Sequence, residues 1–440
     1  MSSAKSPVTA VIVGAGHRAM LYASYAKKHP DELRIVGVAD PTEYRRREAR
    51  EAFGFPAENC FDSAEALAAR GRIADAVING TMDHQHVPTS LPLLASGYDM
   101  LLEKPFAVNE EEMWRLVEAA RAGGRKVMIC HVLRYAPFYA AIRERLAAGA
   151  IGEVINAQYT EHVSYHHVAV GYVRGKWAKR SECHATMLMA KSCHDLDLMA
   201  WMKSGVRPVR VASFGSNFQF RPEKAPPRSG TRCLLDCPIE AECLYSAKKH
   251  YLDHPRRWRF YAWAALENEK NPTPERMFQH MRDESPYGRC AWKCGQDVVD
   301  HQSVAVDFAD GSTATLNMIG GCSKPDRTIH LIGTTGEIQG SMEAESFVVR
   351  KITPAPGGPE YSEENVDLKV TGDTTGAFGG HGGGDMRMVA DFVRFMRDEP
   401  RSISCTSIDD SVSGHLMGFR ADRAREEGRG IEIPTGPGLA

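Results

Sequence analysis

The chain has 440 residues, of which 43% are hydrophobic and 25% are charged, and its formal net charge is −2. This length allows two domains with separate cores, and the composition is that of an ordinary globular protein. A nearly neutral chain is not expected to bind nucleic acid, because that function requires a strongly basic face. The apolar run at residues 8–13 is too short for a membrane span or a secretory signal, so a cytoplasmic protein without a membrane partner is expected.

The first 130 residues alternate between two kinds of pattern. Apolar runs typical of strands occur at residues 8–13, 33–39, 74–79, 100–102 and 126–130. Stretches typical of helices lie between them at residues 19–28, 44–53, 63–70 and 110–122. Strands that alternate with helices form a parallel sheet with both faces covered. Residues 1–130 are therefore predicted to form an α/β domain.

A glycine-rich motif follows the first strand directly. It reads Gly14-Ala15-Gly16-His17-Arg18-Ala19, which is the G-x-G-x-x-A form of the dinucleotide fingerprint. Gly14 permits the tight turn, Gly16 lets the backbone approach a pyrophosphate, and Ala19 allows close packing of the helix on the strand. The phosphates would bind to backbone amides at the start of the helix, around His17 and Arg18.

Asp40 ends the second strand, where an acidic residue can accept hydrogen bonds from both hydroxyls of the adenosine ribose. A carboxylate there also repels a 2′-phosphate, which favours NAD over NADP. The arginines at 45–47 could weaken that repulsion. The alternative is that Asp40 only caps the next turn.

The fifth strand ends in Glu103-Lys104-Pro105, and Thr81 and His86 follow the fourth strand. Together with the fingerprint, these residues resemble the glucose–fructose oxidoreductase and inositol dehydrogenase family (Gfo/Idh/MocA). The resemblance covers nearly the whole chain and implies an α/β protein. Its N-terminal Rossmann domain would be followed by an α+β domain at residues 131–440 with a large, mostly antiparallel sheet. The nicotinamide would lie between the two domains.

The resemblance also assigns roles. Thr81, His86, Glu103 and Lys104 would lie against the cofactor. An ammonium beside the reacting hydroxyl can hydrogen-bond an oxygen that is becoming a carbonyl, so Lys104 is a candidate catalytic residue. The alternative for Lys104 is a surface pair with Glu103.

A second catalytic candidate lies in the apolar stretch at residues 194–199. His194 and Asp197 are three residues apart, so they share one face of a helix. Many family members carry an aspartate four residues before this histidine, whereas this chain has Ala190 followed by Lys191. The proton acceptor could therefore be Lys104, His194 or Lys191.

Several further residues are candidates for binding the substrate. Residues 161–177 combine histidine, aromatic and arginine side chains that suit a sugar ring, although they could equally form a surface loop or a subunit contact. The helix expected at residues 385–397 should return toward the cleft and bring the preceding histidine with it. The substrate candidates are Arg134, Tyr135, Tyr165, His166, Asp197 and His381.

Residues 221–296 interrupt the second domain and contain five cysteines. Two close-set groups separated by a loop can supply the four thiolates of a structural zinc site. The predicted ligands are Cys237, Cys243, Cys290 and Cys294, and Cys233 is left over. The alternatives are an iron–sulfur cluster or five independent thiols.

The reaction that fits best is hydride transfer between a ring hydroxyl of a sugar, glycoside or cyclitol and NAD. One alternative is a redox-neutral glycosidase that oxidises C3 transiently and eliminates the glycosidic bond. The other is a sensor that binds the dinucleotide without catalysis. A homo-oligomer is expected, because relatives commonly associate through the faces of their sheets.

Overall fold

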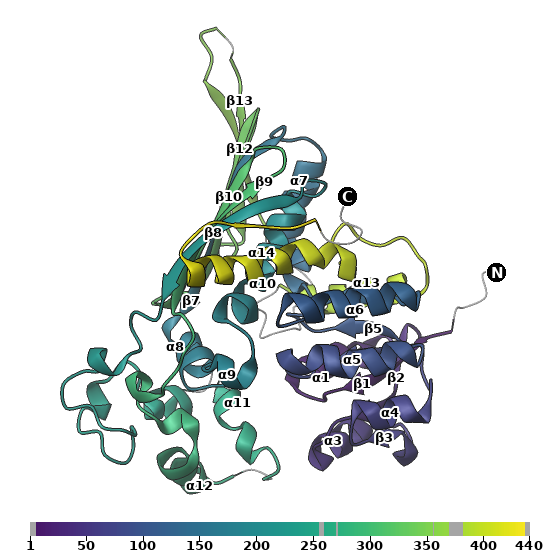
Figure 1. Cartoon of the computed structure of the whole chain (residues 1–440), viewed down its shortest axis with the longest axis vertical. Coiled ribbons are helices and arrows are strands. Elements are labelled where there is room, and N and C mark those ends of the chain that lie inside the picture. The colour runs from purple at the N-terminus through teal and green to yellow at the C-terminus, as the bar shows by residue number, and fades with distance from the viewer. Residues whose placement is uncertain (1–5, 255–258, 270–271, 355, 369–381, 436–440) are drawn as a thin grey trace.

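The computed structural model describes residues 6–254, 259–269, 272–354, 356–368 and 382–435. Two sheets organise this part of the chain, and Figure 1 shows them as separate layers with helices packed around each. None of the described helices is long and apolar enough to cross a lipid bilayer.

The N-terminal sheet has six strands in the order β3-β2-β1-β4-β5-β6, and all of its pairings are parallel. Its strands are β1 (Val8–Val13), β2 (Leu33–Ala39), β3 (Cys60–Phe61), β4 (Ala76–Asn79), β5 (Asp99–Leu102) and β6 (Val127–Ile129). Its helices are α1 (His17–Ala23), α2 (Tyr25–Lys28), α3 (Glu43–Phe53), α4 (Ala64–Arg70), α5 (His86–Ala95) and α6 (Glu110–Ala122). The predicted parallel α/β arrangement is confirmed.

The second sheet has nine strands in the order β14-β13-β12-β11-β7-β10-β9-β8-β15. Only the pair β7 and β10 is parallel, so the predicted large and mostly antiparallel sheet is confirmed. Its strands are β7 (Val154–Ser164), β8 (Pro208–Ser216), β9 (His301–Phe308), β10 (Thr313–Cys322), β11 (Asp326–Gly333), β12 (Gly336–Ser341), β13 (Ser346–Ile352), β14 (Tyr361–Asp367) and β15 (Ile431–Glu432).

Alternation along the strands decides which face of the nine-stranded sheet is covered. Val304, Val306 and Phe308 of β9 are buried, while the residues between them are more exposed. This period of two is typical of a sheet that packs on one face only. The packed face carries the helices α7 (Pro137–Ala147), α10 (Met187–Met202) and α14 (Ile408–Glu427), as Figure 1 shows.

The helix α10 is buried almost all round, because it lies between the large sheet, α14 and the loops of the N-terminal domain. The helix α13 (Gly384–Met396) follows the large sheet in the chain but packs into the N-terminal domain. Met388, Val389 and Phe392 of α13 share a buried apolar cluster with Ala19 and Tyr22 of α1. The chain therefore returns to the first domain after the large sheet.

The insertion lies between β8 and β9 and consists of short helical turns and loops. Its α-helices are α11 (Arg259–Ala262) and α12 (Pro274–Gln279). It packs against the segment that contains α8 (Tyr165–Val168) and α9 (Arg180–Cys183), on the side of the molecule away from β13 (Figure 1).

Candidate functional site

The predicted site residues follow the carboxyl ends of the parallel strands. Gly14 follows β1, Asp40 follows β2, Thr81 follows β4 and Lys104 follows β5, while His131, which was not predicted, follows β6. In open α/β sheets this edge is where dinucleotides bind. The candidate site lies here, beneath α10.

The fingerprint loop has the shape that a dinucleotide needs. Gly14 has φ +72°, and a Cβ at this position would lie 2.8 Å from the backbone nitrogen of Thr81. By contrast, a Cβ at Gly16 would have no atom within 4 Å, so the space beside this residue is open. No side chain caps the amides of the first turn of α1. Open space beside amides that no side chain caps fits a pyrophosphate.

Asp40 links the fingerprint loop to the start of α3. Its Oδ2 accepts a hydrogen bond from the Ala15 amide at 2.8 Å, and its Oδ1 accepts one from the Thr42 amide at 2.8 Å. Each carboxylate oxygen has a further lone pair, so the side chain can still accept ribose hydroxyls. Arg46 donates to the Asp40 carbonyl oxygen and Arg45 donates to Glu267, so these two arginines already have protein partners.

Glu103 is the centre of a buried polar network. It accepts hydrogen bonds from Arg18 Nε at 3.0 Å, from the Tyr22 hydroxyl at 2.5 Å and from the Lys104 amide at 2.8 Å. Arg18 also pairs with Asp385 of α13 at 2.6 Å. Burial alone would raise the pKa of Glu103, but Arg18 and Lys104 outweigh it and lower the pKa to about 2. The network joins β5, α1 and α13 beside the cofactor loop.

Glu103 is expected to make the fold sensitive to acid. Because its folded pKa lies near 2 and its ordinary value is 4.5, its contribution is complete above the ordinary value and is lost as pH falls toward the folded one. Glu103→Gln should cost about 1–3 kcal/mol at neutral pH and flatten the acid limb of stability. Urea unfolding at a series of pH values measures this. Acid limbs that remain parallel, with exposed Glu111→Gln as the control, would contradict it.

His86 joins two loops of the site. It is 1% exposed, with Nδ1 2.7 Å from the Pro105 carbonyl oxygen and Nε2 3.1 Å from that of Thr81. The Thr81 hydroxyl donates to Asn79 Oδ1 at 2.9 Å. Both predicted residues therefore shape the backbone on which a nicotinamide ribose would lie.

Lys104 contacts the helix that carries His194. The Lys104 ammonium donates to the Ala190 carbonyl oxygen on α10 at 3.0 Å. His194 lies one turn further along α10 and is 8% exposed. Its ring is edge-on to that of His131, with 5.8 Å between the ring centroids. The Glu-Lys-Pro motif therefore contacts the helix that carries the histidine of the second domain.

Lys191 belongs to a buried ionic network on the sheet side of α10. Its ammonium lies 3.2 Å from Glu161 Oε1, and Glu161 also pairs with Arg327. Arg327 Nε donates to Asp195 Oδ1 at 2.9 Å. Burial lowers the pKa of Lys191, whereas the Glu161 carboxylate raises it. For the acidic Asp195 burial has the opposite effect and raises the pKa to about 6, although the Arg327 guanidinium opposes this rise. Sequence reasoning missed Glu161, Asp195 and Arg327.

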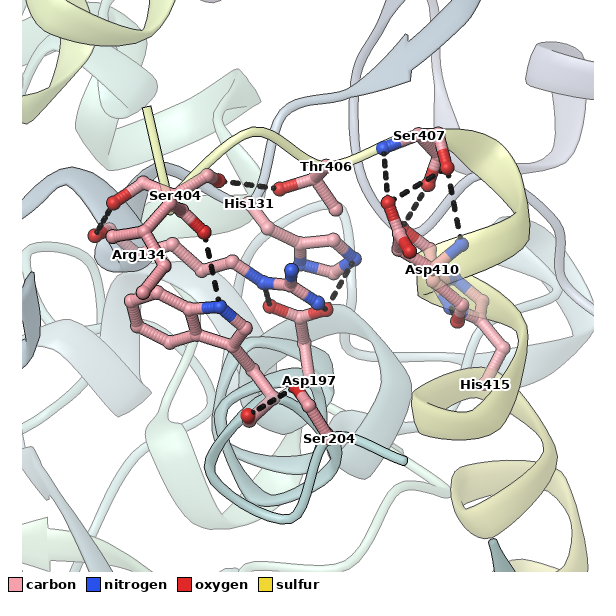
Figure 2. Close-up of polar contacts among 12 residues, drawn as sticks. His131, Arg134, Asp197, Ser204, Ser404, Thr406, Ser407, Asp410 and His415 are labelled. Carbon is pink, nitrogen blue, oxygen red and sulfur yellow. Dashed lines mark hydrogen bonds and ion pairs between the residues drawn. The ribbon is translucent and has the colours of Figure 1, made fainter. Parts of the chain in front are cut away.

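Arg134 and Asp197 form a buried ion pair, which Figure 2 shows. Arg134 Nε and Nη2 donate to the two Asp197 carboxylate oxygens at 2.7 and 2.6 Å, and both residues are 3% exposed or less. Tyr135 donates to Asp391 on α13 at 2.9 Å. These three predicted substrate residues are thus turned toward protein partners.

Two histidines that sequence reasoning missed lie beside this pair. His131 Nε2 is 3.7 Å from Asp197 Oδ1, and the ring of His415 on α14 is 5.9 Å from that of His131 (Figure 2). The His415 Nε2 accepts a hydrogen bond from the Phe106 amide at 3.1 Å. Burial lowers the pKa of both histidines, that of His415 to about 3, so both rings are neutral near pH 7.

The segment around α8 faces both the site and the insertion. The ring of Tyr165 packs edge-on against His250 of the insertion at 5.5 Å. His166 Nε2 lies 3.2 Å from the Ser164 hydroxyl. Trp177 Nε1 donates to Asp83 Oδ2, just after β4, at 2.8 Å. The remaining substrate candidate, His381, lies outside the described residues.

The predicted zinc site is wrong. Over the described ranges, which include all four predicted ligands, no group of three or more His, Cys, Asp or Glu side chains could hold a metal ion. Cys290 and Cys294 instead pack into an apolar cluster, and Cys294 Sγ donates to the Cys290 carbonyl oxygen at 3.2 Å. Cys243 Sγ accepts a hydrogen bond from the Tyr245 amide, and Cys237 is partly exposed. Burial raises the pKa of Cys243, Cys290 and Cys294, so they behave as small apolar residues.

Comparison with known proteins agrees with the fold and with the cofactor loop. Residues 8–131 match the model of an oxidoreductase family with an NAD-binding Rossmann fold, GFO_IDH_MocA. YteT of Bacillus subtilis (strain 168) is 24% identical over 335 residues, which cover 74% of this chain and 73% of that protein. Inositol 2-dehydrogenase 4 of Saccharopolyspora erythraea is 32% identical over 143 residues, which cover 32% of this chain and 41% of that protein.

Among solved structures, a levoglucosan dehydrogenase in complex with NADH and levoglucosan superposes with a TM-score of 0.67. The superposition covers 98% of this chain and 100% of that one, at 15% sequence identity. At this identity the likeness establishes the fold alone, which extends over both domains.

Proposed function

Because this chain belongs to the Gfo/Idh/MocA family of oxidoreductases, we propose that it is an NAD-dependent dehydrogenase of sugars, glycosides or cyclitols. The observation that carries this proposal is the contact of Lys104, at the carboxyl end of the dinucleotide sheet, with the helix that carries His194. The levoglucosan and inositol dehydrogenases among the similar proteins act on this class of substrate, which supports the same class here.

NAD supplies a ring carbon that accepts a hydride from the substrate carbinol. The residues that would hold NAD are those of the fingerprint loop, with Asp40 at the adenosine ribose and Thr81, His86 and Lys104 toward the nicotinamide. Open space at Gly16 and the spare lone pairs of Asp40 fit this assignment.

We assign Lys104 and His194 different roles at the substrate hydroxyl. The Lys104 ammonium now donates to a carbonyl oxygen on α10, and a substrate oxygen in its place would receive the same hydrogen bond. His194 lies one turn away and can take or return the hydroxyl proton. Lys191 is already engaged by Glu161, so we assign it to positioning α10 on the sheet.

A substrate panel tests the proposal. The protein is incubated with NAD and free sugars, cyclitols or nitrophenyl glycosides, while NADH absorbance and nitrophenol release are followed together. We expect lasting NADH without nitrophenol for at least one polyol. Nitrophenol release that requires NAD but leaves no NADH would contradict the proposal and establish a redox-neutral glycosidase. Tight NAD binding without turnover of any substrate would also contradict it.

Asp40 is expected to set the choice between NAD and NADP. Asp40→Asn removes the charge that repels a 2′-phosphate and weakens the bonds to the ribose hydroxyls. The Kd for NADH should rise about 10–100-fold, and that for NADPH should fall. Titration by NADH fluorescence measures both. Surface variant Asp62→Asn is the control, and an unchanged ratio of the two Kd values would contradict the assignment.

We also propose that the chain forms a homo-oligomer through the open face of the nine-stranded sheet. Phe214 on β8 and Ile319 on β10 lie on this face, 74% and 40% exposed. A sheet face that no described helix covers and that exposes apolar side chains is a candidate association site. The mass in solution, measured by light scattering, tests this, and a monomer at micromolar concentration would contradict it.

The free thiols of all eleven cysteines favour a reducing compartment such as the cytoplasm.

A further inference from the structure

The insertion between β8 and β9 reaches across to the N-terminal domain at two points. At one point, Arg45 on α3 donates from Nε to Glu267 Oε1 at 3.0 Å. At the other, the ring of His17 at the start of α1 stacks on Phe260 of α11, with 5.2 Å between centroids and 28° between planes. These contacts join residues more than 200 positions apart in the sequence.

The two points lie at two positions along the expected cofactor path. His17 belongs to the loop that would hold the pyrophosphate, whereas α3 begins just after Asp40, which would hold the adenosine ribose. A dinucleotide in a Rossmann crevice runs from one of these positions to the other. Residues 260–267 therefore bridge the stretch of the sheet edge where the adenosine diphosphate half of the cofactor would lie.

The second domain adds a cation to this side of the site. The Lys176 ammonium lies 4.2 Å from the centre of the Trp177 ring, 5.8 Å from that of Tyr261 in the insertion, and 3.6 Å from Met82 Sδ. Within the described ranges no carboxylate pairs with it, although most other cations near the cofactor loop have one. Trp177 is itself fixed to Asp83, so the ammonium is held beside the loop that follows β4.

We propose that residues 260–267 and Lys176 form an outer wall of the cofactor site, with Lys176 binding the cofactor pyrophosphate. This proposal depends on the proposed use of NAD as the cofactor. Its consequence is kinetic: the dinucleotide cannot leave until the Arg45–Glu267 pair or the His17–Phe260 stack has opened. Sequence reasoning predicted a structural metal site in the insertion. We instead assign the insertion to retention of the dinucleotide.

The first experiment measures how fast NADH leaves the full-length protein, by stopped-flow fluorescence with excess NAD as the displacing ligand. Glu267→Gln and Phe260→Ala are each expected to raise the dissociation rate about 3–10-fold, because each removes one anchor of the wall. Glu269→Gln is the matched control, since Glu269 pairs with Arg276 within the insertion. Equal rates for Glu267→Gln and Glu269→Gln would overturn the proposal.

The second experiment separates phosphate binding from other roles of Lys176, with ADP-ribose and adenosine as probes in calorimetric titrations. Lys176→Met should weaken ADP-ribose binding about tenfold and leave adenosine binding unchanged, and Lys176→Arg should restore the affinity for ADP-ribose. The same loss for both ligands, or no loss for either, would overturn the assignment. The readouts are binding alone, so a protein that binds ADP-ribose in this way but oxidises no polyol would contradict the proposed function and not the wall.

Discussion

Replacing Lys104 by methionine is expected to lower kcat for polyol oxidation by about 10²–10⁴-fold. Methionine keeps the length of the side chain and removes the ammonium that donates to the Ala190 carbonyl oxygen beside His194. Steady-state NADH formation measures the loss. Because the fingerprint loop and Asp40 are untouched, the Kd for NADH should change less than about tenfold.

Lys126→Met is the matched control for Lys104→Met. The Lys126 ammonium also donates to a helix carbonyl oxygen, that of Met396 at 3.1 Å, but on the far side of the N-terminal domain from the Lys104 motif. This variant should keep nearly full activity. A Lys104→Met protein that binds NADH and retains kcat within about tenfold would remove Lys104 from the mechanism.

The second large effect is expected when the Arg134–Asp197 ion pair is broken, and it concerns the stability of the fold. Arg134→Met leaves the Asp197 carboxylate buried without its cation, so the free energy of unfolding should fall by about 3–5 kcal/mol. Urea unfolding followed by circular dichroism measures this. Arg134→Met combined with Asp197→Leu should recover much of the loss, because the second change removes the uncompensated charge.

Arg210→Met is the control for this prediction. Arg210 pairs with Asp307 at the surface of the sheet, where the two side chains are 64% and 38% exposed, so its loss should cost at most about 1 kcal/mol. Equal losses for Arg134→Met and Arg210→Met would show that burial of the Arg134–Asp197 pair adds nothing to its effect on stability.

The parallel sheet could be predicted because its signals are local, whereas the large antiparallel sheet was implied by the resemblance to a known family. The alternation of apolar runs with helices and the motif from Gly14 to Ala19 identify the first domain, and the strands β9, β10 and β11 show the period of two expected for the second. Motif residues such as Asp40 and Lys104 were found for the same reason: each directly follows a strand of the parallel sheet.

What could not be predicted depends on contacts between distant segments. Arg327 reaches Glu161 and Asp195 from another strand of the sheet, and His415 reaches His131 from a helix near the end of the chain. Nothing in the spacing of these residues shows that they meet. The prediction of a metal site failed for a related reason. The spacing of the cysteines allows such a site, but it does not show where each thiol points. Cys290 and Cys294 lie in an apolar cluster.

The most direct test of hydride transfer at this site follows the hydrogen itself. The best polyol from the panel, deuterated at its ring carbons, is incubated with NAD and the full-length protein, and the mass of the reduced cofactor is measured. We expect one deuterium in each NADH formed by the unmodified protein, and almost no reduced cofactor with Lys104→Met. Reduced cofactor without deuterium, or none from any sugar or cyclitol, would contradict hydride transfer from a ring carbinol.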